Sequence, residues 1–139
     1  MIGCKAPPSS LPPDAVLSYA VDHLSGSVSL VVKADGTAEY RKSVGFGVKS
    51  GTPTLRATVS PQELRALAAK LRANDFCSLR SGRDTGVPDE ARPTIAVRLE
   101  DLDCRVQLWN GEFRDKPTAQ ASLKAVEALV GVVAKRATP

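Results

Sequence analysis

Two short runs of alternating apolar residues, joined by Asp35-Gly36, constrain the fold more than any other feature of the sequence. Apolar residues recur at every second position in residues 28–32 and again in residues 38–40. A period of two places those side chains on one face of a strand, so each run predicts a strand with one buried side. Asp-Gly between two such runs is a strong hairpin signal, because a tight turn needs backbone angles that glycine tolerates. The sequence therefore predicts an antiparallel hairpin about Asp35-Gly36.

Four further segments show the same alternation and extend the predicted sheet. They lie at residues 17–21, 55–59, 95–99 and 104–108. The last two are separated only by residues 100–103, which we interpret as the turn of a second hairpin. About six antiparallel strands are therefore expected.

Two segments are predicted to be helices. Ser60-Pro61-Gln62-Glu63 is a capping box with proline at the first helical position, and an apolar stripe follows over residues 64–71. A second helix is expected from about Thr118 to Lys135, where apolar residues recur at helical spacing.

The order of these elements predicts the fold class. Four strands, a helix, two strands and a helix, with the strands paired locally, are typical of an α+β domain with helices packed on one face of an antiparallel sheet. With 139 residues and 42% hydrophobic content, the chain suits one hydrophobic core. We expect a single α+β domain over residues 14–139, preceded by a separate segment of residues 1–13.

Residues 1–13 are predicted to be a proline-rich tether. Four of the ten prolines lie between Cys4 and Pro13, and such a stretch favours extended conformations over packing. Ile2-Gly3-Cys4 is similar to the end of a bacterial lipobox, in which the cysteine becomes lipidated, but the basic and apolar segments of a secretory signal are not present before it. Two locations stay open: the cell envelope, with a lipid anchor at Cys4, if a signal has been lost from the start, and otherwise the cytoplasm.

The three cysteines leave two interpretations open. Lipidation of Cys4 would leave Cys77 and Cys104 as one pair, which an oxidising compartment could join as a disulfide. The alternative, which we favour from the residues alone, is two buried thiols that behave as small hydrophobic side chains.

Three pieces of the chain carry a family resemblance. They are Leu30 to Tyr40 with Asp35-Gly36-Thr37 at its turn, the helix from Ser60 to Leu71 with its Phe76-Cys77-Ser78-Leu79 exit, and the strand Pro93-Thr94-Ile95-Ala96-Val97. On these residues the chain resembles a bacterial family of uncharacterised function whose members are often predicted to be exported lipoproteins. The matching residues form turns, caps and core, so the resemblance implies a fold and carries no catalytic residue with it.

The charge pattern does not suit nucleic-acid binding. Nineteen Lys and Arg against fifteen Asp and Glu give a net charge of +4, and both signs are scattered along the chain. The six aromatic residues offer few platforms for base stacking. No apolar run approaches the roughly 18 residues that a membrane-spanning helix needs. We therefore expect no nucleic-acid partner, and contact with a membrane only through a lipid anchor.

No residue pattern indicates catalysis or a metal site. The one histidine, His23, ends a predicted strand, and its combination with Cys77 and Asn110 matches no cysteine-hydrolase spacing. Zinc would lack a Cys-x-x-Cys motif and a second histidine. The carboxylates within residues 100–103 lack the glycine and the later glutamate of a calcium-binding loop. We expect a protein that is not an enzyme and has no cofactor or metal.

The candidate binding residues are Trp109, Phe113 and Arg114. Trp109 falls in the outward phase of a strand whose Val106 points inward, and the other two residues follow closely. Exposed Trp and Arg are frequent anchors of protein interfaces. The alternative is that the last helix or the tether covers Trp109.

These observations predict a non-catalytic binding module. It would recognise a peptide or protein partner through a sheet edge or through the aromatic face around Trp109. Two alternatives are kept: an envelope lipoprotein with a structural role, and a small cysteine-dependent enzyme that uses Cys77.

Overall fold

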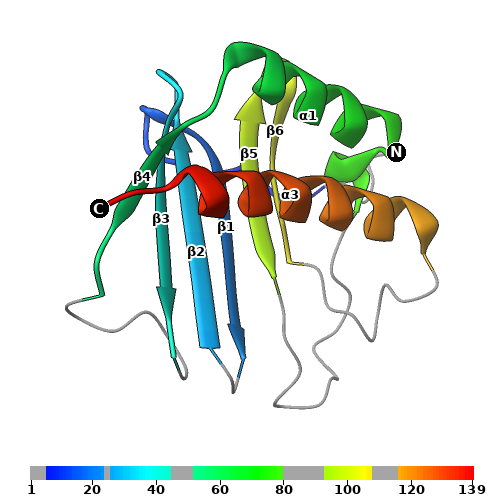
Figure 1. Cartoon of the computed structure of the whole chain (residues 1–139). Helices are drawn as coiled ribbons and strands as arrows, with labels where there is room; N and C mark the ends of the chain where they lie inside the picture. Colours follow the sequence, from blue (N-terminus) through cyan, green and yellow to red (C-terminus); the bar gives the residue numbers. More distant parts are fainter. Residues whose placement is uncertain (1–5, 24–25, 45–51, 80–92, 108–115) are drawn as a thin grey trace.

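The computed structural model describes residues 6–23, 26–44, 52–79, 93–107 and 116–139. Within these residues, six strands form one antiparallel sheet in the order β4-β3-β2-β1-β5-β6 (Figure 1). The elements are β1 (Ala15–His23), β2 (Gly26–Lys33), β3 (Thr37–Ser43), β4 (Leu55–Thr58), α1 (Pro61–Ala73), the 3-10 turn η1 (Phe76–Ser78), β5 (Thr94–Leu99), β6 (Leu102–Gln107) and α3 (Pro117–Arg136).

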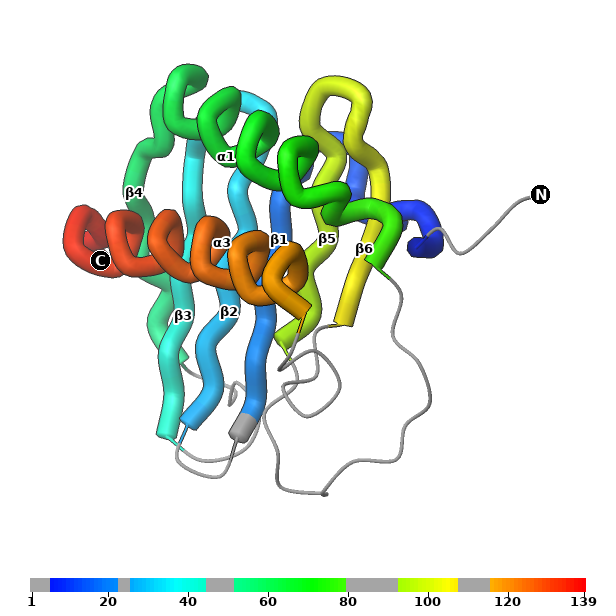
Figure 2. The backbone as a smooth tube through the Cα atoms, turned by 90° about the vertical axis from the view of Figure 1, so that its right-hand side faces the viewer, coloured from blue at the N-terminus to red at the C-terminus, as the bar shows by residue number. Residues whose placement is uncertain are grey.

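Helices α1 and α3 lie side by side on one face of the sheet. They run in opposite directions, and α3 crosses the strands at a steep angle (Figure 2). The predicted α+β class, the predicted order of elements and the packing of both helices on one face are confirmed. The hydrophobic core fills the space between this helical layer and the sheet.

The predicted hairpin between β2 and β3 forms because its turn residues satisfy the backbone. The Asp35 carboxylate accepts the Thr37 N–H at 2.9 Å. Gly36 has a φ of +92°, and a Cβ atom built there would lie 2.6 Å from the carbonyl oxygen of Val59. The Gly36 carbonyl in turn accepts the Val59 N–H at 2.8 Å. Glycine is therefore required both by the backbone angle and by the close approach of a second segment.

Helix α1 begins as the sequence predicts. The Glu63 N–H donates to the Ser60 hydroxyl at 3.1 Å, and the Ser60 N–H donates to the Glu63 carboxylate at 2.9 Å. The capping box satisfies two N–H groups that the first turn leaves without helical partners. The apolar stripe of this helix is buried against the core, and it consists of Leu64, Leu67, Ala68 and Leu71.

The second hairpin has a tighter turn than predicted. We expected a turn over residues 100–103, but Leu102 and Asp103 belong to β6, and Leu102 pairs with Leu99. Glu100 adopts the left-handed region with a φ of +54°, which lets two residues reverse the chain. Leu102 is thereby buried in the core instead of lying in an exposed turn.

Candidate functional site

Cys77 and Cys104 form a disulfide that joins η1 to β6. Their Cα atoms are 5.6 Å apart, Cys104 is buried, and Cys77 packs against the core. The structure thus contains the disulfide and not the two free thiols that we favoured from the residues alone. The thiolate is the nucleophilic state of a cysteine. While it is bonded to Cys104, Cys77 has no thiolate.

The carboxylates predicted to lie in one turn contact other parts of the protein. Arg72 of α1 donates to Glu100 at 2.6 Å and to Asp101 at 3.2 Å. Asp103 accepts the Ser9 N–H at 3.0 Å, and hydrogen bonds from Ser9 lower the pKa of its carboxyl. Among the described residues, no three His, Cys, Asp or Glu side chains are placed to hold a metal ion.

The candidate binding residues Trp109, Phe113 and Arg114 lie outside the described residues, as do Cys4 and Asn110. The alternation that places Trp109 on the outer side of its strand can be followed as far as Gln107. Up to that point the strand alternates as predicted, since Val106 is buried and Gln107 is exposed, whereas Leu108 lies outside the described residues. His23 is the last residue of β1, as expected.

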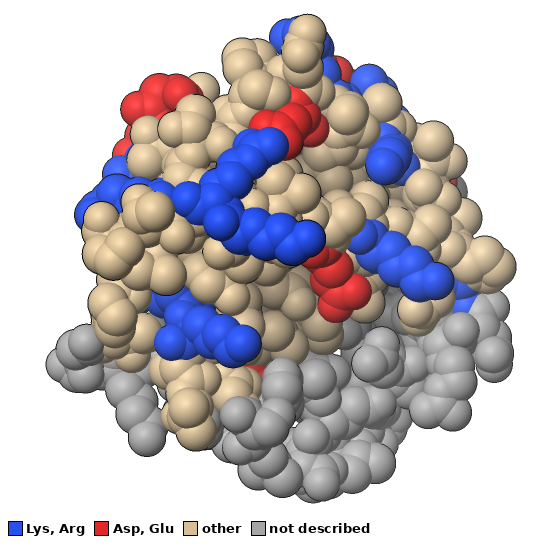
Figure 3. Space-filling view, in the orientation of Figure 1, with Lys and Arg blue, Asp and Glu red and all other residues tan. Residues whose placement is uncertain are grey.

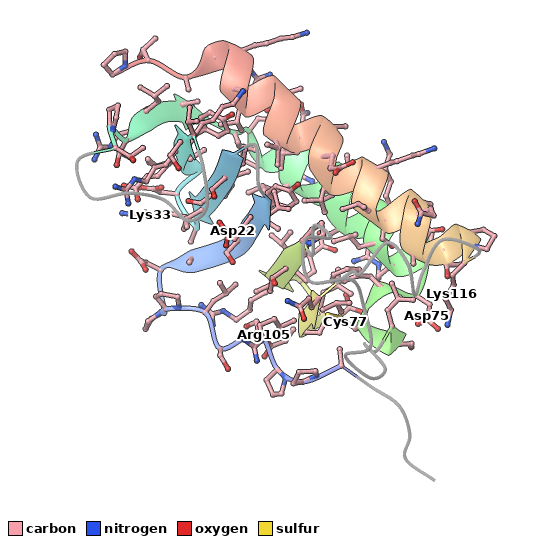
Figure 4. All side chains as sticks on the ribbon, turned by 90° about the horizontal axis from the view of Figure 1, so that it is seen from below. Asp22, Lys33, Asp75, Cys77, Arg105 and Lys116 are labelled. Atoms are coloured by element: carbon pink, nitrogen blue, oxygen red, sulfur yellow. A yellow bond between two sulfur atoms is a disulfide. The ribbon has the colours of Figure 1, made fainter. Side chains whose placement is uncertain are left out.

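The N-terminal segment lies against the edge strand β6 from Ala6 onward. The Ala6 N–H donates to the Cys77 carbonyl at 2.9 Å, and the Arg105 N–H donates to the Pro7 carbonyl at 2.9 Å. Figure 4 shows Cys77 and Arg105 close to this segment. Residues 6–13 of the predicted tether are thus in contact with the domain. Their carbonyl groups accept hydrogen bonds from the domain, whereas in a free tether water would supply those bonds.

Arg98 of β5 holds the second half of this segment. Its guanidinium donates to the carbonyls of Leu11 at 3.2 Å, Pro12 at 2.6 Å and Ala15 at 2.9 Å. A planar guanidinium with five N–H donors suits such a group of converging carbonyls. One side chain therefore fixes the path by which the chain enters β1.

The C-terminus contacts the opposite edge of the sheet. The Arg56 N–H of β4 donates to the Thr138 carbonyl at 2.8 Å, and the Thr138 N–H donates to the Arg56 carbonyl at 3.0 Å. An incoming peptide strand would need these same backbone groups. At Arg56 and at Arg105, the sheet edges that we considered for peptide binding are occupied by the chain itself.

An open groove lies between α1 and α3. It encloses about 170 Å³, and aliphatic side chains form most of its walls. Its lining residues are Glu63, Ala66, Leu67 and Lys70 from α1, and Ala125, Ala128, Leu129 and Val132 from α3.

An ion pair closes one end of the groove. Arg136 at the end of α3 donates to both carboxylate oxygens of Glu63, at 2.8 and 2.9 Å, and also to the Thr58 carbonyl at 3.1 Å. The hydrogen bonds from Arg136, together with the one from the Ser60 N–H, lower the pKa of Glu63 to about 2. Glu63 is therefore ionised and engaged, and it offers little free negative charge at this end.

Two lysines flank the other end of the groove. Lys70 lines it one turn beyond Ala66, and Lys124 lies one turn before Ala128 on α3. Both lysines are exposed, and neither has an ion-pair partner within the described part of the chain. Of the two, Lys70 lines the groove, whereas Lys124 lies outside its lining residues.

The groove was not predicted from the sequence. The sequence does contain one indication of the groove: Ala66 and Ala128 are small residues that lie outside the apolar stripes of their helices, on exposed sides. That signal is weak, since alanine is also the best helix former and occurs on many solvent-facing helical surfaces.

Comparisons with known proteins do not assign the chain to a family. No protein-family model matches the sequence, and no curated protein is significantly similar to it. In the segments that the structure describes, no helix combines the length and the apolar character required to cross a lipid bilayer.

Proposed function

We propose that this protein is a non-catalytic binding module that recognises a peptide or protein partner through the groove between α1 and α3. The observation that carries the proposal is the groove itself, which is open, mostly aliphatic and lined at one end by Lys70, a lysine without an ion-pair partner among the described residues. Concave apolar surfaces with a few polar groups at the rim are common binding sites. The sheet edges support the proposal less well, because the termini contact them at Arg56 and Arg105.

The size of the groove favours a peptide segment over a small molecule. Ligand pockets for small molecules usually enclose roughly 300 to 1,000 Å³, whereas this groove encloses about 170 Å³. A shallow hollow between two helices can instead accept one or two aliphatic side chains of a partner segment. The alternative of a cysteine-dependent enzyme has less support, because Cys77 is bonded to Cys104.

Selection from a random peptide display library on the immobilised protein tests this function. Ala128 is exposed and lines the groove, so Ala128→Trp should fill it and abolish capture of the selected peptides. Ala134→Trp is the matched control, since Ala134 is also exposed on α3 but is not a lining residue. Peptides that bind both variants and the unmodified protein equally, or no enrichment at all, would contradict the proposed function.

A further inference from the structure

We propose that the segment recognised by this groove is an acidic amphipathic helix of a partner protein. This inference rests on the proposed function and adds the chemistry of the occupant. Its basis is the charge of the two helices, the position of that charge along the groove, and the small side chains on the groove walls.

The helical face carries an excess of positive charge. Helices α1 and α3 together contain six Lys or Arg residues and two Glu residues, and Figure 3 shows Lys and Arg side chains spread over this face with few acidic ones. Of the two glutamates, Glu63 is paired with Arg136. Glu127 is exposed on α3 and has no ion-pair partner among the described residues, so the two helices carry one free carboxylate against four exposed basic residues without ion-pair partners, Arg65, Lys70, Lys124 and Lys135.

Exposed basic residues without an ion-pair partner among the described residues lie towards both ends of the helix pair, Lys70 and Lys124 towards one and Arg65 and Lys135 towards the other, and of these Lys70 lines the groove. The helices are antiparallel, so the Glu63–Arg136 pair marks one end, and Lys70 and Ala125 line the groove at the other (Figure 1). Lys70 lies about 10 Å further along α1 than Glu63, since a helix rises about 1.5 Å per residue. A partner would therefore place its carboxylates near Lys70 and Lys124.

The groove walls allow a partner helix to approach closely. Ala66 and Ala128 are exposed and present only methyl groups, Ala125 and Val132 are half-buried, and the buried Leu67 and Leu129 lie at the base of the groove. A helix with aliphatic residues at spacings of three and four would insert one or two of them between α1 and α3. Its remaining acidic residues would face the lysines, whose methylene stems extend the apolar surface.

Two synthetic helical peptides provide the probe. Both carry leucine at positions i, i+3, i+4 and i+7, and they differ only in having glutamate or lysine at the exposed positions. We expect the glutamate peptide to bind in fluorescence anisotropy, and its affinity to fall as salt rises because the attraction is partly screened. The lysine peptide should bind at least about tenfold more weakly, since like charges at the rim repel it.

Charge reversal at the groove is the decisive variant. Lys70→Glu combined with Lys124→Glu should weaken binding of the glutamate peptide by about tenfold and improve binding of the lysine peptide. The control, Lys42→Glu combined with Arg105→Glu, changes the net charge equally at exposed residues of β3 and β6. It should leave both affinities within about twofold, because those residues lie outside the groove.

The outcomes separate this inference from the proposed function. Equal binding of the two peptides, or no effect of the groove lysines, would overturn the acidic occupant while leaving groove-dependent capture of library peptides intact. Loss of the distinction between Ala128→Trp and Ala134→Trp in the library selection would instead overturn the binding function itself. Circular dichroism and thermal unfolding of each variant establish that the compared proteins are folded.

Discussion

At the scale of single residues, Ser122 is a buried polar group whose hydroxyl has no hydrogen-bond partner among the described residues. It lies on the sheet-facing side of α3, and its side chain is fully buried. A buried hydroxyl without a partner has a desolvation cost of roughly 1 to 3 kcal/mol. The same residue type is favourable at Ser60, where the hydroxyl caps α1.

Ser122→Ala should raise the free energy of unfolding by about 1 kcal/mol, because it removes the unsatisfied group and improves helix propensity. Urea denaturation measures this change. Ser60→Ala is the control and should lower the free energy of unfolding by about 1 kcal/mol through loss of the cap. A destabilised Ser122→Ala protein would show that its hydroxyl has a partner in solution.

Two glycines give opposite expectations for the same substitution. Gly36→Ala places a Cβ atom 2.6 Å from the Val59 carbonyl at a positive φ, so it should lower the free energy of unfolding by at least about 1 kcal/mol. Gly131→Ala in α3 meets no described atom within 4 Å and should raise it by about 0.5 to 1 kcal/mol. Thermal unfolding of both variants tests the pair, and equal shifts in Tm would contradict the turn geometry.

At the scale of elements, the contact between Glu63 and Arg136 joins the start of α1 to the end of α3. The pair is bidentate, and Arg136 also reaches the carbonyl of Thr58 at the end of β4. A single guanidinium therefore links α1, α3 and β4 at one end of the groove. The strength of this link depends on the ionisation of Glu63.

Acid should weaken this contact in a defined pH range. The pKa of Glu63 is lowered from 4.5 to about 2 in the folded protein, so its contribution is fully present above about pH 4.5 and is lost as the pH falls toward 2. Glu63→Gln should therefore reduce the dependence of unfolding free energy on pH between these values. Urea denaturation at a series of pH values measures this pH dependence. The same pH dependence in the variant as in the unmodified protein would contradict the pairing of Glu63 with Arg136.

At the scale of the whole molecule, the first and last segments of the described chain contact the two edges of the sheet. The N-terminal segment meets β6 at Arg105, next to Cys104, and meets η1 at Cys77, so the disulfide lies between the two contacts. The C-terminus meets β4 at Arg56. Edge strands with unpaired backbone N–H and C=O groups can pair with strands of other chains. These contacts occupy some of those groups.

Reduction of the disulfide should loosen one edge more than the other. We expect the free energy of unfolding to fall by about 2 to 4 kcal/mol, and the Arg105 amide to exchange with solvent faster, because reduction frees η1 and β6 from each other. The Arg56 amide at the far edge is the internal control in native-state hydrogen exchange. Equal acceleration at both amides would show a global effect and contradict a local one.

Thiol titration of the denatured protein checks the pairing itself. Unreduced protein should show one reactive thiol, that of Cys4, and reduced protein should show three. Three reactive thiols before reduction would show that Cys77 and Cys104 are free in solution.

Much of the fold could be predicted because it depends on neighbouring residues. The strand alternation about Asp35-Gly36 and the capping box at Ser60 act over a few residues, so the sequence alone determined these elements and, through their order, the α+β class. The binding prediction at Trp109 depends on a segment outside the described residues and stays a prediction.

Only the tertiary structure decided which distant residues meet. The Ser9 N–H bonds to Asp103 across 94 positions, and Glu63 pairs with Arg136 across 73. No local pattern encodes such contacts, because they depend on how the helices and termini pack on the completed sheet. The disulfide, the covered sheet edges and the groove between α1 and α3 were decided at this level, since each is formed by residues that become neighbours only when the core closes.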